Sequence, residues 1–355
     1  MYLGAKSDKG IPRGATPQLC RSRGHSEVYT SHSPSTMNSN DKPRVITLPG
    51  QRLRNLAMVL LQQHPIHSSS THRTPKYDYS IQIVTISDTH NTQPNLPAGD
   101  VLIHAGDLSE NGSFDEIQKQ LTWLSSQPHQ YKICIAGNHD VLLDEEFLEK
   151  YPERRYDDPR TLKDLNWGSV HYLNRSSITL EFPSHSTPQS EVRKLRIYGS
   201  PWTPQYVPSA FQYPRSEDIW EDCIPSGTDI VVTHGPPRLH LDTRDFYRAG
   251  CPYLAQEVAR VCPSMVVFGH IHAAYGREDV VLDGVRRSYE EIVGDWAGSG
   301  ALLWMGVRVL GARVRCWVVG REKMVRSQMV TTFVNAAVVG GSKNELRNEP
   351  IVVEL

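Results

Sequence analysis

The chain has 355 residues, of which 39% are hydrophobic and 22% charged, and its formal net charge at pH 7 is −1. This length is sufficient for the core of one catalytic domain with additional segments. The near-zero net charge excludes a chain-wide attraction to nucleic acid or anionic membranes, so any electrostatic attraction must be local. None of the six cysteines forms a C-x-x-C pair, and Cys134 falls in an apolar run, which favours a reducing intracellular compartment over a disulfide framework.

Residues 1–78 are expected to form a mostly disordered extension ahead of a catalytic domain at 79–355. Residues 1–50 are rich in Ser, Thr, Pro, Gly and His, so they bury too little apolar surface to offset the entropy cost of ordering. The leucines within 51–63 predict one short helix. No long apolar stretch indicates a secretory signal; the basic start leaves a transit peptide open, but we expect a cytoplasmic protein.

Five apolar runs in the domain are typical of buried strands, and each is followed by a short polar motif. The runs cover residues 81–86, 101–103, 131–135, 229–233 and 265–268, and the motifs after them are Asp88-Thr89-His90, Gly106-Asp107, Gly137-Asn138-His139-Asp140, His234-Gly235 and Gly269-His270-Ile271-His272. Because open α/β sheets place their ligand crevices at the carboxyl ends of strands, the five motifs are expected to meet at one site.

Helices are expected between these strands. Ser113 and Glu116 form a capping box ahead of apolar residues at helical spacing, and the same spacing recurs over 254–261. The alternation predicts βαβ-like units. Residues 141–228 contain Pro-rich and charged loops that are expected to wall the cleft.

Residues 278–329 are interpreted as an insertion before a returning strand at 331–336. A predicted helix over 301–317 carries apolar residues on one face: Leu303, Val307, Leu310, Val314 and Trp317. Three arginines within this run argue against a transmembrane span. Two interpretations stay open: a surface helix packed on its own domain, or a contact with a membrane surface or a protein partner.

The five motifs supply the oxygen and nitrogen ligands that two divalent metal ions require. Asp107 is the natural carboxylate to bridge the two ions. Asp88 and His90 are two residues apart, so both can point to one side of an extended strand end and bind the first ion. His272 would complete that first position.

Asn138, His234 and His270 would bind the second ion, since an amide oxygen and neutral imidazoles are ligands that need no deprotonation. The alternative is that all of these side chains only cap strands and turns. His104, inside a strand pattern, is expected to be a hydrogen-bonded core residue and not a ligand.

This ordered set resembles the calcineurin-like metallophosphoesterase superfamily, and more closely its metallophosphoesterase-domain-containing branch. The similarity is carried by residues 101–108, 199–204, 232–237, 269–276 and 331–336. The resemblance implies a four-layer αββα sandwich with two mixed sheets, a dinuclear site at the sheet edges and metal-dependent phosphoesterase activity on a small phosphate ester. Among Mn, Fe, Zn and Mg, Mn is the favoured metal.

One departure from the superfamily bears on the substrate. Ser/Thr protein phosphatases carry Gly-Asp-x-x-Asp-Arg-Gly, whose arginine binds the substrate phosphate, whereas this chain has Asn111 at that place. Asp140, and not a glutamate, follows the Asn-His pair. Without this arginine, the site lacks a clamp for a dianionic phosphate but keeps the ligands of both metals, which suits a phosphodiester because it carries one charge fewer. The motifs also look like those of cyclic-nucleotide phosphodiesterases. We expect a phosphodiesterase; a phosphomonoesterase is the alternative.

The expected mechanism uses a hydroxide that bridges the metals, because two divalent ions lower the pKa of a bound water from about 15.7 towards about 7. His139, next to a ligand but not itself a ligand, is placed to protonate the leaving alkoxide. By analogy with the superfamily's dyad carboxylate, Glu110 would orient His139; the alternative for Glu110 is a solvated loop residue. Trp202 and Tyr206 could stack on a nucleobase or serve only in packing.

Two other classes compete with this interpretation. A non-catalytic scaffold that binds metal or nucleotide is possible on the same fold, although every ligand type is present here. A nuclease is disfavoured because the sequence shows no basic groove with interleaved aromatic residues.

Overall fold

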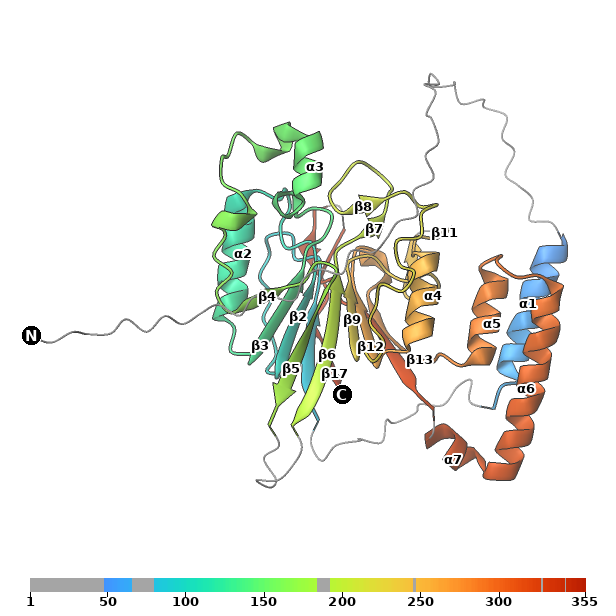
Figure 1. Cartoon of the computed structure of the whole chain (residues 1–355). Helices are drawn as coiled ribbons and strands as arrows, with labels where there is room; N and C mark the ends of the chain where they lie inside the picture. Colours follow the sequence, from blue (N-terminus) through green and yellow to red (C-terminus); the bar gives the residue numbers. More distant parts are fainter. Residues whose placement is uncertain (1–47, 66–79, 184–191, 245–246, 327, 342) are drawn as a thin grey trace, which may run out of the picture.

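The computed structural model describes residues 48–65, 80–183, 192–244, 247–326, 328–341 and 343–355. Two sheets form its centre (Figure 1). The first has the order β17-β1-β2-β3-β4, with β1 Gln82–Ile86, β2 Val101–Ala105, β3 Tyr131–Ile135, β4 Val170–Tyr172 and β17 Ile351–Glu354. The second has the order β13-β14-β12-β9-β6-β5, with β5 Ser176–Phe182, β6 Arg193–Ser200, β9 Ile230–Thr233, β12 Met265–Phe268, β13 Gly276–Val281 and β14 Val330–Asn335.

Both sheets are mixed. Strands β1 to β4 are parallel and β17 is antiparallel, while β6, β9, β12 and β14 are parallel between two antiparallel edge strands. The central strands are apolar on both faces, because one face packs on the other sheet and one on a helix. Helix α2, Phe114–Ser126, covers the first sheet and α4, Pro252–Val261, covers the second. The predicted four-layer αββα sandwich is therefore confirmed.

The predicted capping box at the start of α2 is present. The Ser113 hydroxyl accepts from the main-chain N–H of Glu116, and the Glu116 carboxylate accepts from the N–H of Ser113 at 3.1 Å. The same carboxylate accepts from Asn111 Nδ2 at 3.0 Å and from Asn91 Nδ2 at 2.7 Å. Asn111 is thus held by the helix terminus.

Short elements and loops surround the sandwich. They are the 3₁₀ turns Val141–Leu143, Pro152–Arg155, Leu162–Asp164 and His272–Ala274, helix α3 Glu145–Lys150, and the two-residue strands β7 Thr203–Pro204, β8 Gln212–Tyr213, β10 Thr243–Arg244, β11 Tyr247–Arg248, β15 Val339–Gly340 and β16 Glu345–Leu346. Cys134 is buried in β3 with a free thiol.

Four further helices are α1 Leu48–Gln62, α5 Gly284–Val293, α6 Ser299–Val319 and α7 Arg321–Arg326. In Figure 1, α1, α5 and α6 lie side by side to the right of α4, and α7 lies at the lower end of α6. The predicted helix at 51–63 is confirmed as α1, and it packs on α5 and α6, which lie within the predicted insertion. Their shared core contains Ala57, Leu61, Val285, Ile292, Met305 and Val309. The prediction of disorder for residues 1–47 and 66–78 lies outside the described residues.

The α6 helix does not pack through its predicted apolar face. Met305 and Val309 are buried, whereas the predicted residues are 50% to 87% exposed. The helix therefore packs on its own domain, as one of the two interpretations held, but through the opposite face, which contacts α1 and α5. Among the described helices, none is long and apolar enough to cross a bilayer.

Buried His240 connects α5 to the second sheet. Its Nδ1 lies 2.8 Å from the Glu278 carboxylate on β13, its Nε2 lies 3.4 Å from the Glu290 carboxylate on α5, and its ring stacks on Phe333 at 3.8 Å. Burial opposes the charged imidazole, but the two carboxylates outweigh it and raise the pKa of His240. Helices α1, α5 and α6, here the helical unit, are thus joined to the sandwich by the ion pairs of His240 with Glu278 and Glu290.

Candidate metal centre

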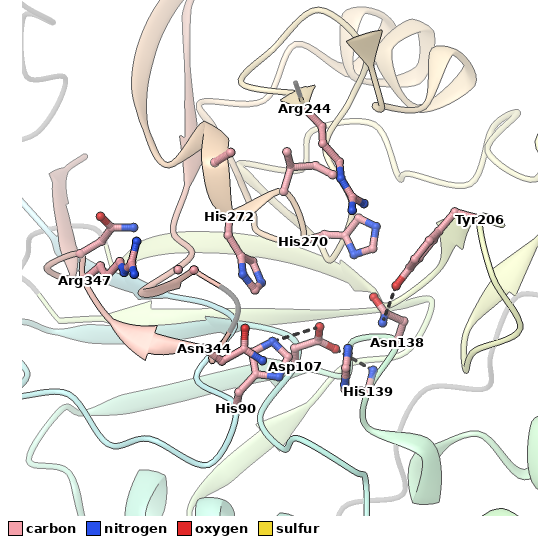
Figure 2. Close-up of a pocket in the computed structure, with 15 residues that line it drawn as sticks. His90, Asp107, Asn138, His139, Tyr206, Arg244, His270, His272, Asn344 and Arg347 are labelled. Atoms are coloured by element: carbon pink, nitrogen blue, oxygen red, sulfur yellow. Dashed lines mark hydrogen bonds and ion pairs between the residues drawn. The ribbon is translucent and has the colours of Figure 1, made fainter. Parts of the chain in front are cut away.

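The carboxyl ends of β1, β2, β3, β9 and β12 meet at one edge of the two sheets, as the strand order requires. The loops there bring all seven predicted ligand residues together. Three sets of side chains place potential ligand atoms within 4.8 Å of one another: Asp88 with His90 and His272, His90 with Asp107 and His139, and Asp88 with Asp107 and His234. Figure 2 shows side chains of this group converging on a pocket.

The first predicted metal position is built on buried Asp88. One carboxylate oxygen lies 3.1 Å from His272 Nε2, and both accept from the main-chain N–H of His270 at 3.0 Å. His90 is buried, and its Nδ1 lies 3.1 Å from the Glu110 carboxylate, whereas Nε2 makes no hydrogen bond within the described chain and lies 3.7 Å from Asp107 Oδ2. Because a buried, unsatisfied nitrogen is costly, His90 fits a ligand to an ion.

The second predicted position lies around His234 Nε2. This nitrogen lies 3.3 Å from Asp107 Oδ2 and 3.0 Å from Asn138 Oδ1, while Nδ1 lies 3.0 Å from the carbonyl of Ala105. A proton on Nδ1 satisfies that carbonyl and leaves a lone pair on Nε2. A lone pair facing two acceptor oxygens repels them unless a proton or a cation lies between. The donor set therefore fits a metal ion.

The pKa shifts at the site follow from the same close contacts between carboxylates and imidazoles. Burial alone would raise the pKa of Asp107, but His234 and His139 outweigh it and hold that pKa well below its usual value. Burial opposes a charged His234, yet Asp107 raises the pKa of His234 to about 9, so without metal a proton takes the place between Nε2 and the two oxygens that an ion would fill. Burial lowers the pKa of His270 to about 3, so His270 stays neutral, as a ligand must be.

Two glycines leave room for the carboxylates. A Cβ on Gly269 would lie 1.9 Å from Asp88 Oδ2, and a Cβ on Gly137 would lie 2.2 Å from Asp107 Oδ1. Asp88 and Asp107 themselves adopt left-handed backbone, with φ of 53° and 55°. Such backbone is strained for non-glycine residues and is typical of functional sites.

Substituting Gly269 by Ala is expected to displace the Asp88 carboxylate and to weaken metal binding about 10- to 100-fold, the range for disturbing a ligand's support. Metal titration of the apoprotein measures the effect. Gly300→Ala is the matched control, because nothing lies within 4 Å of that position. Unchanged metal affinity in Gly269→Ala would show that Asp88 holds no ion.

His139 is oriented differently from the sequence-based expectation. Its Nδ1 lies 2.7 Å from the main-chain carbonyl of Glu110, and its main-chain N–H donates to Asp107 Oδ1 at 2.8 Å. The Glu110 carboxylate instead lies 3.1 Å from His90 Nδ1 and accepts from Asn344 Nδ2 at 2.9 Å. The main chain at 110 therefore orients His139, and the side chain supports His90.

Asp140 has a structural role that no sequence pattern indicated. Its buried carboxylate accepts from the main-chain N–H groups of Gly137, Leu108 and Ser109 at 2.8 to 3.1 Å and from the Ser109 hydroxyl at 2.7 Å. These bonds tie the loop after β2 to the loop after β3. As predicted, His104 is buried and hydrogen-bonded, with Nε2 2.9 Å from the Thr89 hydroxyl.

A cavity of about 620 Å³ is lined by His139 and by five of the seven predicted ligands: His90, Asp107, Asn138, His270 and His272. Its wall also contains Tyr206, Arg244, Asn344, Arg347 and Asn348. In Figure 2 Arg244 reaches towards His270, and Arg347 lies on the other side of His272. Asn111 is not in the cavity wall. Position 111 therefore supplies no clamp, as expected, but two arginines from other segments lie in the wall.

Neither arginine belongs to a ligand motif, so no spacing pattern in the sequence identified them.

The two aromatic candidates, Trp202 and Tyr206, differ in position. The Tyr206 hydroxyl accepts from Asn138 Nδ2 at 3.2 Å and its ring meets His270 at 5.2 Å, so Tyr206 lies in the site. Trp202 packs on Phe211, and Arg175 lies over its ring, so Trp202 has the packing role and not the stacking role.

Comparisons with known proteins agree with this geometry. A family model described as calcineurin-like phosphoesterase matches residues 66–274. The chain is 41% identical over 223 residues to metallophosphoesterase domain-containing protein 1 of Homo sapiens, covering 60% of this chain and 66% of that protein. It is 40% identical over 291 residues to "Probable rhamnogalacturonate lyase C" of Emericella nidulans, covering 81% of this chain and 26% of that protein.

The chain thus spans less than two thirds of the length of either relative. Among solved structures, TT1561 of Thermus thermophilus matches 57% of this chain and 86% of its own, with a TM-score of 0.35 and 12% sequence identity.

Proposed function

Because this chain belongs to the calcineurin-like phosphoesterase family, we propose that it hydrolyses a small phosphate ester with two divalent metal ions, Mn²⁺ being favoured. Asp88, His90 and His272 hold the first ion; Asn138, His234 and His270 hold the second; Asp107 is shared. The observation that carries this proposal is the cluster of acceptor atoms around Asp107 Oδ2 and His234 Nε2, 3.3 Å apart. The carboxylate and amide oxygens suit Mn²⁺, while the imidazoles also suit Zn and Fe.

When bound, the two ions supply Lewis acidity, which lowers the pKa of water from about 15.7 towards about 7 and stabilises charge on phosphoryl oxygens. The protein supplies the proton for the leaving group from His139. Burial opposes the charged imidazole, but Asp107 outweighs it and raises the pKa of His139. His139 Nδ1 faces the Glu110 carbonyl, so Nε2 is the nitrogen left to serve the leaving oxygen.

A phosphodiester is the proposed substrate class, with cyclic nucleotides as the first candidates, and Tyr206 beside the site offers a ring for a base to stack on. A specific observation favours phosphomonoesters as the second candidate. Arg244 and Arg347 in the cavity wall can bind the extra charge of a dianionic phosphate, which Asn111 cannot.

Hydrolysis of bis-p-nitrophenyl phosphate and p-nitrophenyl phosphate separates the two candidates. We expect the parent protein to show the higher kcat/KM on the diester. A strong preference for the monoester would overturn the diester proposal and establish the second candidate, with the metal centre unaffected.

Arg244→Gln and Arg347→Gln are expected to lower kcat/KM for the monoester about tenfold more than for the diester, because a hydrogen bond to a charged group contributes about 1.5–3 kcal/mol. Steady-state kinetics on both substrates measures the ratio. Arg277→Gln is the control, since Arg277 is paired with Asp279 away from the cavity. Equal losses on both substrates would assign the arginines a role other than reading charge.

A further inference from the structure

Helix α6 directs a row of apolar side chains into solvent. This row, here the α6 stripe, comprises Leu303, Val307, Leu310, Val314 and Trp317, with exposed fractions of 75%, 50%, 64%, 54% and 87%. The residues recur every three or four positions, so they share one helical face. A contiguous exposed apolar row is typical of a surface that contacts something else.

The charges on α6 are all of one sign. The helix contains Arg308, Arg313 and Arg315 and no acidic residue. At 100° per residue, Arg313 lies about 80° from the centre of the stripe on one side and Arg315 about 120° on the other, while Arg308, at about 140°, points towards α5. Arg308 Nη1 donates to the Gly284 carbonyl and the Ser288 hydroxyl of α5, so Arg308 serves the packing of the helices. Arg313 and Arg315 are exposed, and neither is paired with a carboxylate within the described chain, so their positive charge is available to an anionic surface.

We infer that the α6 stripe is a membrane-docking surface that lies flat on an anionic bilayer, with its apolar side chains among the acyl chains and the exposed Arg313 and Arg315 at the headgroups. An apolar face with arginines at its borders is the pattern of interfacial helices. Trp317, the most exposed residue of the stripe, is a residue type enriched at membrane interfaces. None of the described helices can span the bilayer, so the contact is peripheral.

Charge also favours lipid over a second copy of this chain. Two α6 helices joined through their stripes would bring arginines of both copies to the borders of one interface, where they repel. Anionic lipids attract the same arginines. None of the stripe residues lines the cavity of the metal centre, so docking is independent of hydrolysis.

Co-sedimentation of the full chain with vesicles tests the inference. We expect binding to vesicles of phosphatidylcholine with phosphatidylserine, and weak binding to phosphatidylcholine alone or at high salt. Arg313→Gln combined with Arg315→Gln should weaken binding roughly 25-fold, at about fivefold for each charge. Leu310→Ser with Trp317→Ser should weaken it at least about tenfold.

Tyr156→Ser is the matched control, because Tyr156 is an exposed aromatic residue outside the helical unit. The stripe residues are exposed, so their variants should keep the parent's circular dichroism spectrum and melting temperature. The inference would be overturned if the parent did not bind anionic vesicles, or if Leu310→Ser with Trp317→Ser, here the stripe variant, bound them as tightly as the parent. Concentration-dependent dimers that the stripe variant abolishes, without vesicle binding, would assign the surface to a second copy instead.

Discussion

Asp107→Asn is expected to lower metal content at both positions and to reduce hydrolysis on the order of 10³-fold or more. Asp107 Oδ2 lies 3.3 Å from His234 Nε2 and 3.7 Å from His90 Nε2, so it faces both proposed ion positions. Asparagine keeps the shape but loses the charge that two divalent ions require. Metal catalysis contributes several kcal/mol, at about 1.4 kcal/mol for each tenfold in rate.

Elemental analysis and steady-state kinetics of the purified variant measure both effects. Asp115→Asn is the control, since the Asp115 side chain is 79% exposed on α2. A second substitution, His234→Ala, should reduce mainly one of the two ions. Two ions bound to Asp107→Asn as tightly as to the parent would contradict the proposed shared ligand.

His139→Ala should reduce the rate about 10²- to 10⁴-fold on a diester with an alkoxide leaving group, the range for positioned proton transfer. A nitrophenolate is stable as an anion and needs little protonation, so bis-p-nitrophenyl phosphate should suffer far less. The comparison therefore isolates the proton donated by the imidazole.

The metal content of His139→Ala is the decisive companion measurement. His139 shares a ligand cluster with His90 and Asp107, although its Nδ1 already faces the Glu110 carbonyl. Two ions retained, with unequal losses on the two substrates, match a general acid. Loss of one ion would make His139 a ligand. His171→Ala, at an exposed histidine on β4, serves as the control.

The strands and the residues that follow them were predictable because two independent patterns coincide. Apolar runs mark β1, β2, β3, β9 and β12, and parallel strands deliver the residues after them to one edge. The contacts of individual side chains were not predictable. The Glu110 carboxylate turns to His90 and Asn344, and Asn344 is 234 residues away along the chain.

The cavity arginines and the packed face of α6 could not be predicted from the sequence. Arg244 and Arg347 reach the cavity from segments without a motif, so only the fold shows them. For α6, the pattern predicted a helix with one apolar face, yet periodicity does not say which face meets the protein. The contacts that bury Met305 and Val309 come from α1 and α5, and α1 lies far earlier in the chain, at Leu48–Gln62.

The metal stoichiometry of the active protein tests the central claim most directly. The purified full chain is chelated and then titrated with metal. Elemental analysis gives the number of ions per chain at each step, and an activity assay gives the rate of hydrolysis. We expect two divalent ions per chain, loss of phosphoester hydrolysis as they are removed, and recovery with Mn²⁺ only when both positions are filled. Full activity in metal-free protein, or full activity with a single ion, would contradict the dinuclear centre.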